Sequence, residues 1–144
     1  MEENGTALGM SYYLAFLAEA LAARGETRES RRLAERALER VRAADRVGEV
    51  AAHRALAVSL ARDYPEDWSR AAQEFERAWS LSAAKGSPRE AALTDLACAG
   101  CHRERGENDE ARKLAARAQD AFEAMDMAWY GERARALQAA VAGA

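Results

Sequence analysis

The stretch GETRESRRLAERAL, residues 25–38, carries the pattern that decides the fold. It opens with a glycine of the kind that ends helices, and Thr27 follows where a helix N-cap belongs. Ser30, Ala34 and Ala37 then recur at spacings of four and three, which places small side chains on one face of a helix. The stretch therefore predicts the end of one helix, a tight turn, and a second helix with a small-residue face.

Two later stretches repeat this pattern. Their small residues match those of the first stretch at intervals of 41 and 40 positions, at Ser30, Ala71 and Ala111 and likewise at Ala37, Ala78 and Ala118. Helices approach closely only where side chains are small, so each repeat predicts a helix pair that packs within itself and against the next pair. A fixed period of about 40 residues with two helices per unit is typical of a helical solenoid.

Glycines and N-cap residues divide the whole chain into seven expected helices. The strongest start is Ser87-Pro88-Arg89-Glu90, and Asp67 and Asn108 are further expected N-caps. The expected helices cover residues 7–24, 27–44, 48–63, 67–85, 88–105, 108–125 and 127–142. We therefore predict an all-α fold and a single domain over 1–144, with helix pairs at about 7–44, 48–85 and 88–125 and a capping helix at about 127–142.

Composition agrees with a small helical protein and excludes several classes. The 144 residues include 37 alanines and 19 arginines, both strong helix formers, and the net charge is −3, which excludes a strongly basic nucleic-acid binder. No apolar run approaches the roughly 20 residues of a membrane span. The acidic residues 1–5 show no export signal, and two cysteines cannot form a disulfide framework. We expect a cytoplasmic protein that binds neither nucleic acid nor membrane.

Residues 25–38 resemble the tetratricopeptide repeat (TPR) family in the leading glycine, the positions of the small residues and the Ala-Leu ending. The units here are longer than those of that family and end without its proline. The resemblance implies a right-handed α-α superhelix, a TPR-like solenoid. In such a solenoid the first helix of each pair lines a concave surface that binds a protein or peptide.

A narrower resemblance covers almost the whole chain. The stretches that carry it are residues 12–20, 49–56, 75–78, 92–97 and 125–134. In this order they are similar to the C-terminal repeat region of large bacterial signalling ATPases, including cyclase-linked and transcription-regulator types. This resemblance implies an alternative function, that of a regulatory or sensory module that docks on an ATPase or cyclase domain of a larger protein.

The family resemblance also assigns the residues of the concave face. Counted from the small residues Ala18, Ala57 and Ala99, the residues expected to bind a partner are Tyr12, Glu19, Arg54, Val58, Arg62, Leu96, Arg103 and Glu104. Small or apolar residues expected on the same face are Ala15, Ala22, Ala23, Ala51, Leu93 and Gly100. Tyrosine and arginine are enriched at binding hot spots, and arginine pairs bidentately with carboxylates, so we expect a partner that carries carboxylates.

The segment Cys98-Ala99-Gly100-Cys101-His102 spells the attachment pattern of c-type haem. The same three side chains, with His53 as a fourth ligand, are an alternative zinc site. Both alternatives stay open, but we favour packed side chains and expect no cofactor. Cys98 and His102 match Leu17 and Leu21 of the first unit, on a face expected to be packed, and free cysteine behaves as a small hydrophobe.

The remaining candidates have structural interpretations that we favour. One stripe of arginines consists of Arg28, Arg31, Arg32, Arg36 and Arg40. Glutamates lie among these arginines at helical spacing, which indicates a solvated face with surface ion pairs rather than a phosphate site. Trp129 and Tyr130 are expected to cap the open end of the last repeat. Self-association through open solenoid ends is a further expectation. Since the sequence holds no catalytic motif, we predict a non-catalytic scaffold rather than an enzyme.

Overall fold

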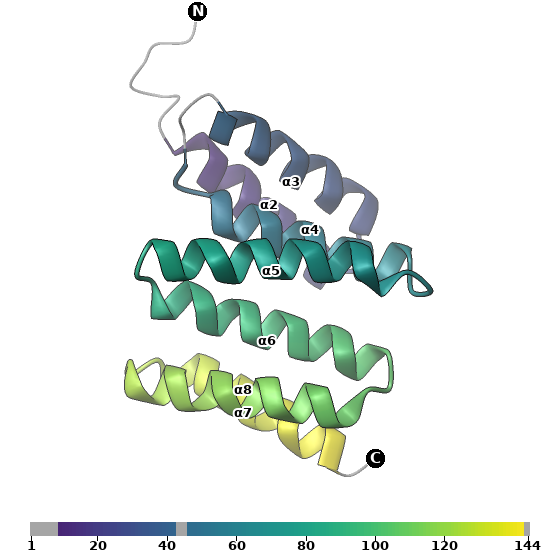
Figure 1. Ribbon diagram of the computed structural model, residues 1–144, viewed down its shortest axis with the longest axis vertical. Helices are drawn as coiled ribbons and strands as arrows, with labels where there is room; N and C mark the ends of the chain where they lie inside the picture. The colour runs from purple at the N-terminus through teal and green to yellow at the C-terminus, as the bar shows by residue number, and fades with distance from the viewer. Residues whose placement is uncertain (1–8, 43–45, 143–144) are drawn as a thin grey trace, which may run out of the picture. The chain divides into compact units, whose positions relative to one another are not determined.

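A computed structural model describes residues 9–42 and 46–142, which form seven α-helices and no strand. The helices are α2 (Met10–Ala23), α3 (Thr27–Arg42), α4 (Glu49–Asp63), α5 (Trp68–Ala84), α6 (Pro88–Glu104), α7 (Asn108–Ala124) and α8 (Ala128–Ala142) (Figure 1). The predicted all-α class is confirmed. Expected helical residues 7–8 and 43–44 lie outside the described residues, and the other expected helix ends agree with the structure to within one residue.

The chain divides into two compact units, Met1–Leu81 and Ser82–Ala144. In the first unit α2 packs against α3 and α4, and α3 also packs against α4. In the second unit α7 packs against both α6 and α8, and α6 also touches α8. Each unit thus shows the helical repeat-like packing that the sequence predicts, in which a helix meets its successor and the helix after that. The expectation of one domain over residues 1–144 stays a prediction.

Small residues make the close helix contacts of both units. The six repeat-matched positions are all fully buried, namely Ser30, Ala71, Ala111, Ala37, Ala78 and Ala118. Ser30 differs from its alanine counterparts because its hydroxyl donates to the carbonyl oxygen of Ala18 at 2.6 Å. The Ser59 hydroxyl donates in turn to Ser30 Oγ at 3.0 Å. These two hydrogen bonds connect α2, α3 and α4.

Three helices end in the same left-handed glycine turn, at Gly25, Gly86 and Gly106, with φ of 83°, 62° and 78°. After Gly106 the N–H of Glu107 donates to the His102 carbonyl at 2.9 Å, the long bond of a Schellman motif. The Ser87 hydroxyl accepts from the Glu90 N–H at 3.2 Å, so this predicted N-cap is confirmed.

The predicted N-cap Asn108 is wrong. Asn108 is the first residue of α7, and Glu107 occupies the N-cap position without a side-chain cap bond. The turn between α6 and α7 is too short for Asn108 to precede the helix. Glu107, whose N–H closes the Schellman motif of α6, is already the residue before the first residue of α7.

The turn after α7 has the same form without a glycine. Asp126 takes a φ of 55°, its N–H donates to the Glu123 carbonyl at 3.1 Å, and the Met127 N–H donates to the Phe122 carbonyl at 2.8 Å. A side chain in this left-handed region is strained, although aspartate tolerates it better than most residues. Residue type alone did not indicate this turn.

Aromatic side chains fill the space that the alanines leave. In the first unit Phe75 is buried, with ring centroids 6.0 Å from both Trp68 and Trp79. In the second unit Phe122 is buried and stacks on Tyr130 at 5.2 Å. Tyr130 therefore packs on the core of its unit, as expected of a cap.

Trp129 lies differently from the expected cap. Its side chain is 63% exposed and meets the Arg133 guanidinium, whose central carbon lies 4.8 Å from the ring. Because Trp129 precedes Tyr130 directly on α8, the helix turns one ring toward the core and leaves the other at the surface.

Gly48 allows α4 to begin directly against α2. Its N–H donates to Ser11 Oγ at 2.9 Å, and a Cβ at this position would lie 2.3 Å from the Ser11 carbonyl carbon. Gly100, inside α6, is the contrasting case, because no described atom that could obstruct a Cβ lies within 4 Å.

We expect Gly48→Ala to lower the free energy of unfolding by about 1–3 kcal/mol, because its methyl group forces α4 away from α2. Gly100→Ala is the matched control and should raise it by about 0.5–1 kcal/mol, since alanine favours a helix interior. Urea unfolding followed by circular dichroism measures both. Equal effects of the two substitutions would contradict the close approach at Gly48.

We expect Asp126→Gly to raise the free energy of unfolding by about 0.5–1 kcal/mol. Relief of the left-handed conformation is worth about 1–2 kcal/mol, which exceeds the roughly 0.4–1 kcal/mol of unfolded-state entropy that glycine adds. Gly106→Asp, at the matching turn, should lower the stability instead. The same unfolding experiment tests both variants, and a loss of stability in Asp126→Gly would contradict the strain.

Candidate functional site

Arg54 and Glu19, both expected on an open binding surface, pair with each other between α4 and α2. Arg54 is 3% exposed, and its Nε donates to Glu19 Oε1 at 2.5 Å. Burying a guanidinium is costly unless a carboxylate accompanies it, so this pair holds α2 and α4 in register. The structure gives Arg54 a place inside the first unit rather than on its surface.

Another predicted residue of the first unit, Arg62, also contributes to this helix contact. The Arg62 Nη1 donates to the Ala22 carbonyl oxygen, near the end of α2, where helix carbonyls attract cations. Val58 is half-buried on the same helix as Arg62. Among the predicted binding residues of the first unit, Tyr12 is the one that the structure leaves exposed.

The predicted residues of the second unit fall into two environments. Leu96 is half-buried and packs against the core cluster that contains Ala92 and Phe122. Arg103 and Glu104, in the last turn of α6, are exposed. Arg103 is thus the predicted arginine that stays accessible for a carboxylate.

The arginine stripe of α3 is solvated only in part. Arg32 pairs with Glu29 on the exposed face, as expected. Arg31 instead reaches the end of α4, where its guanidinium lies 3.3 Å from Asp63 and donates to the Tyr64 hydroxyl at 3.3 Å. Hydrogen bonds from Arg31 and Arg70 lower the pKa of Tyr64. Arg31 therefore connects α3 to the turn after α4.

The segment with two cysteines and a histidine is an ordinary part of α6. Cys98 and Cys101 are each 2% exposed, and His102 Nδ1 lies 3.4 Å from Glu107 Oε1. A hydrogen bond from Arg105 lowers the pKa of Glu107, burial opposes this shift, and His102 adds to it. Within residues 9–42 and 46–142, no three His, Cys, Asp or Glu side chains are gathered closely enough to hold a metal ion.

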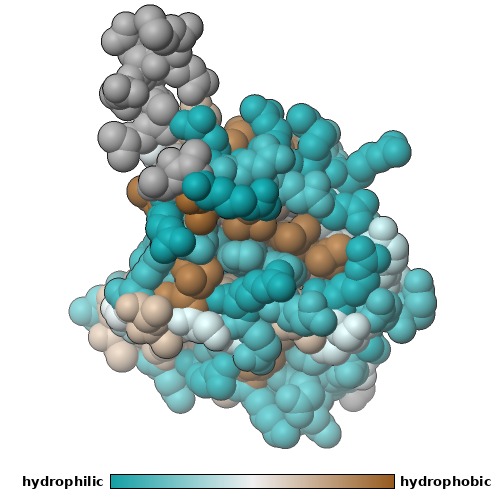
Figure 2. Space-filling view, turned by 45° about the horizontal axis from the view of Figure 1, so that its top comes forward, coloured by the Kyte–Doolittle hydropathy of each residue, from teal (hydrophilic) through white to brown (hydrophobic). Residues whose placement is uncertain are grey.

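An exposed apolar surface lies on α2, and we name it the aromatic face of α2: Tyr12, Tyr13, Phe16 and Leu17. Tyr13 is 65% and Phe16 57% exposed, and the rings of Tyr12 and Phe16 stack with centroids 6.5 Å apart. Figure 2 shows one face of the molecule, on which hydrophobic residues reach the surface among a majority of hydrophilic ones; the residues of the aromatic face itself are given by their exposed fractions. Exposed apolar residues that are clustered on one helix face are candidates for an interaction site.

Leu17 corrects an expectation, since the sequence placed it on a packed face and the structure leaves it 49% exposed. The reason becomes clear from the matching positions in α4. Counted from the buried Ala18 and Ala57, the residues Tyr13, Phe16 and Leu17 match Ala52, Ala55 and Leu56.

In α4 these matching residues are buried, and Ser59, one turn further along that face, bonds to Ser30 of α3. The face of α4 is therefore turned toward α3, the preceding helix. Among the helices that the structure describes, none precedes α2 to cover its aromatic face in the same way. Residue type and period alone did not reveal this, because burial depends on which helix is the neighbour.

Comparisons of the chain with protein-family models, with curated proteins and with solved structures found no match. The TPR-like arrangement thus remains an inference from the residues. No helix of the described part of the chain is long and apolar enough to cross a membrane.

We expect Glu19→Gln to lower the free energy of unfolding by about 1–3 kcal/mol, because it leaves the buried Arg54 guanidinium without its carboxylate. Glu29→Gln is the matched control, since it removes the carboxylate of an exposed pair with Arg32 and should change stability much less. Urea unfolding at neutral pH measures both. An equal effect of the two substitutions would contradict a structural role of the Glu19–Arg54 pair.

Proposed function

We propose that this chain is a non-catalytic protein–protein interaction module built as a right-handed, TPR-like solenoid. The repeated burial of small residues at matching positions supports this architecture, as does the packing of α2 on α3 and α4 and of α6 on α7 and α8. The aromatic face of α2 is the observation that carries the interaction function. Tyrosine and phenylalanine bring large, rigid contact areas, and exposed aromatic residues gathered on one helix face suit a binding hot spot.

The partner we propose for this face is an α-helix with small side chains. In α4 the matching face meets α3 at Ser30, a small and fully buried residue. On α2, Tyr13 and Phe16 replace two alanines and extend further from the helix. A helix can therefore lie against α2 only if it presents alanine, serine or glycine opposite these rings, at spacings of three and four residues.

The exposed residues of the predicted concave face extend this proposal. In the first unit, Tyr12 belongs both to that face and to the aromatic face. In the second unit, taken by itself, Arg103 offers a guanidinium that can pair with a carboxylate. The alternative, a regulatory module that docks within a larger ATPase or cyclase, uses the same surfaces on a partner domain of the same protein.

A photoreactive benzoylphenylalanine in place of Phe16 tests the partner helix. In the cells that naturally express the chain, we expect it to cross-link to a helical segment with small residues three and four apart. The same photoreactive residue in place of Trp129, another exposed aromatic residue, is the control and should not label that segment. Cross-links to a second copy of this chain, or identical products from both positions, would overturn the proposed partner.

The double variant Tyr13→Ser with Phe16→Ser tests the energetics of the same contact. We expect it to weaken binding of the cross-linked partner at least tenfold, since each hot-spot side chain contributes about 2 kcal/mol or more. Because both side chains are exposed, thermal unfolding should be almost unchanged. Undiminished affinity in a folded variant would contradict binding through this face.

A further inference from the structure

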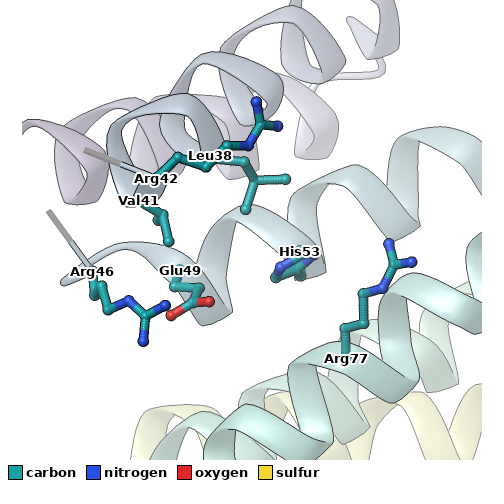
Figure 3. A pocket seen from close by; sticks show the side chains of 7 residues that line it. All are labelled: Leu38, Val41, Arg42, Arg46, Glu49, His53 and Arg77. Atoms are coloured by element: carbon teal, nitrogen blue, oxygen red, sulfur yellow. The ribbon is translucent and has the colours of Figure 1, made fainter. Parts of the chain in front are cut away.

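A hollow of about 520 Å³ opens in the first unit between the end of α3, the start of α4 and the middle of α5 (Figure 3). From α3 it receives the apolar side chains of Leu38 and Val41. Its volume lies within the range of small-ligand sites, about 300–1,000 Å³. The hollow shares no residue with the aromatic face of α2 or with the surface predicted for a peptide partner.

Cationic groups dominate the polar lining. Among the described residues that line the hollow, Arg42, Arg46 and Arg77 accompany one carboxylate, that of Glu49, so that the formal charges of these described residues sum to +2. Figure 3 shows Arg46 and Glu49 on one side of the hollow, with His53 and Arg77 on the other. Glu49 lies in the first turn of α4, where the helix N-terminus stabilises a carboxylate.

Glu74 fixes the side of the hollow that α5 forms. Its Oε2 lies 2.6 Å from His53 Nδ1, and its Oε1 accepts a hydrogen bond from the Arg77 guanidinium. Glu74 is buried, and its carboxylate reduces the charge around the hollow to +1. With Nδ1 held by Glu74, Nε2 is the ring nitrogen of His53 that remains for a ligand. This contact orders the imidazole and Arg77 before any ligand arrives.

We propose that this hollow binds an organic oxyanion, a carboxylate or phosphate group attached to an apolar body. The guanidinium groups that line the hollow attract the oxyanion, and the planar donors of each match carboxylate and phosphate oxygens. Leu38 and Val41 contact the apolar body. This combination distinguishes the hollow from a solvated arginine cluster, which would attract any anion by charge alone.

A nuclear magnetic resonance titration tests the proposal with phenyl phosphate, benzoate, inorganic phosphate and benzyl alcohol as probes. We expect saturable shifts of the His53 ring and of the α3 and α4 amides with phenyl phosphate or benzoate. The ratio of those two affinities tells which oxyanion the hollow prefers. Inorganic phosphate should bind about tenfold more weakly because it lacks the apolar contacts, and benzyl alcohol should not bind.

Charge variants distinguish binding by the arginines of the hollow from attraction by the net charge of the protein. Arg42→Gln with Arg77→Gln should weaken binding at least tenfold, since a charge-assisted hydrogen bond contributes about 1.5–3 kcal/mol. Arg28→Gln with Arg36→Gln removes two positive charges from exposed sites on α3 outside the hollow, and should change the affinity by no more than about twofold.

Three results would overturn the proposal. One is the absence of saturable shifts with both phenyl phosphate and benzoate. Another is equal affinity for phenyl phosphate and inorganic phosphate, which would remove the role of Leu38 and Val41. The third is an equal loss of affinity in the two double variants, which would show that net charge alone attracts the probes. Circular dichroism of each variant confirms that the comparison is made on folded protein.

Discussion

The close approach of helix backbones, permitted by missing side-chain volume, is the constraint on which the first unit depends. At Ala18, Ser30 and Gly48 the main chain of α2 meets α3 and the start of α4 with nothing larger than a hydroxymethyl group between them. Such contact removes water from backbone groups, so the buried hydroxyls must be hydrogen-bonded. Ser30 and Ser11 meet this demand by bonding to the main chain of the neighbouring segments. The same small residues therefore let the helices pack closely and provide hydrogen bonds for the buried polar groups.

Arginine performs a second structural task, which is to connect helices over longer distances. Arg54 reaches Glu19 between α4 and α2, and in the second unit Arg117 holds the buried Asp95 through two hydrogen bonds of 2.9 and 2.6 Å. A planar guanidinium suits this task because it offers several donors in a fixed geometry. In an alanine-rich core such pairs bridge gaps that short side chains leave. Abundant arginine in this chain thus reflects contacts between helices as much as a surface for ligands.

Local signals made most of the fold predictable, and contacts between helices explain the remainder. Glycine turns and the Ser87 cap act within a few residues, so the helix ends followed from the sequence. The break at Asp126 also followed, but its left-handed φ did not, because that φ is held by hydrogen bonds rather than by residue type. Arg54 was assigned to an open surface because the family resemblance places its repeat position on the concave face, yet its environment depends on Glu19, 35 positions away. The exposure of Leu17 likewise depends on the absence of a covering helix among those described.

The aromatic face of α2 and the hollow of α3–α5 belong to the same compact unit, and α4 lies in contact with both α2 and α3. The Glu19–Arg54 pair and the Ser59–Ser30–Ala18 hydrogen bonds tie α4 to α2 along its length. A helix that moves α2 on docking must therefore either carry α4 with it or break buried polar contacts. Because His53 lies on α4 beside Arg54, movement of α4 would alter the distance between His53 and Glu74 on α5. The polar contacts of α4 thus lie between the two surfaces, which share no residue.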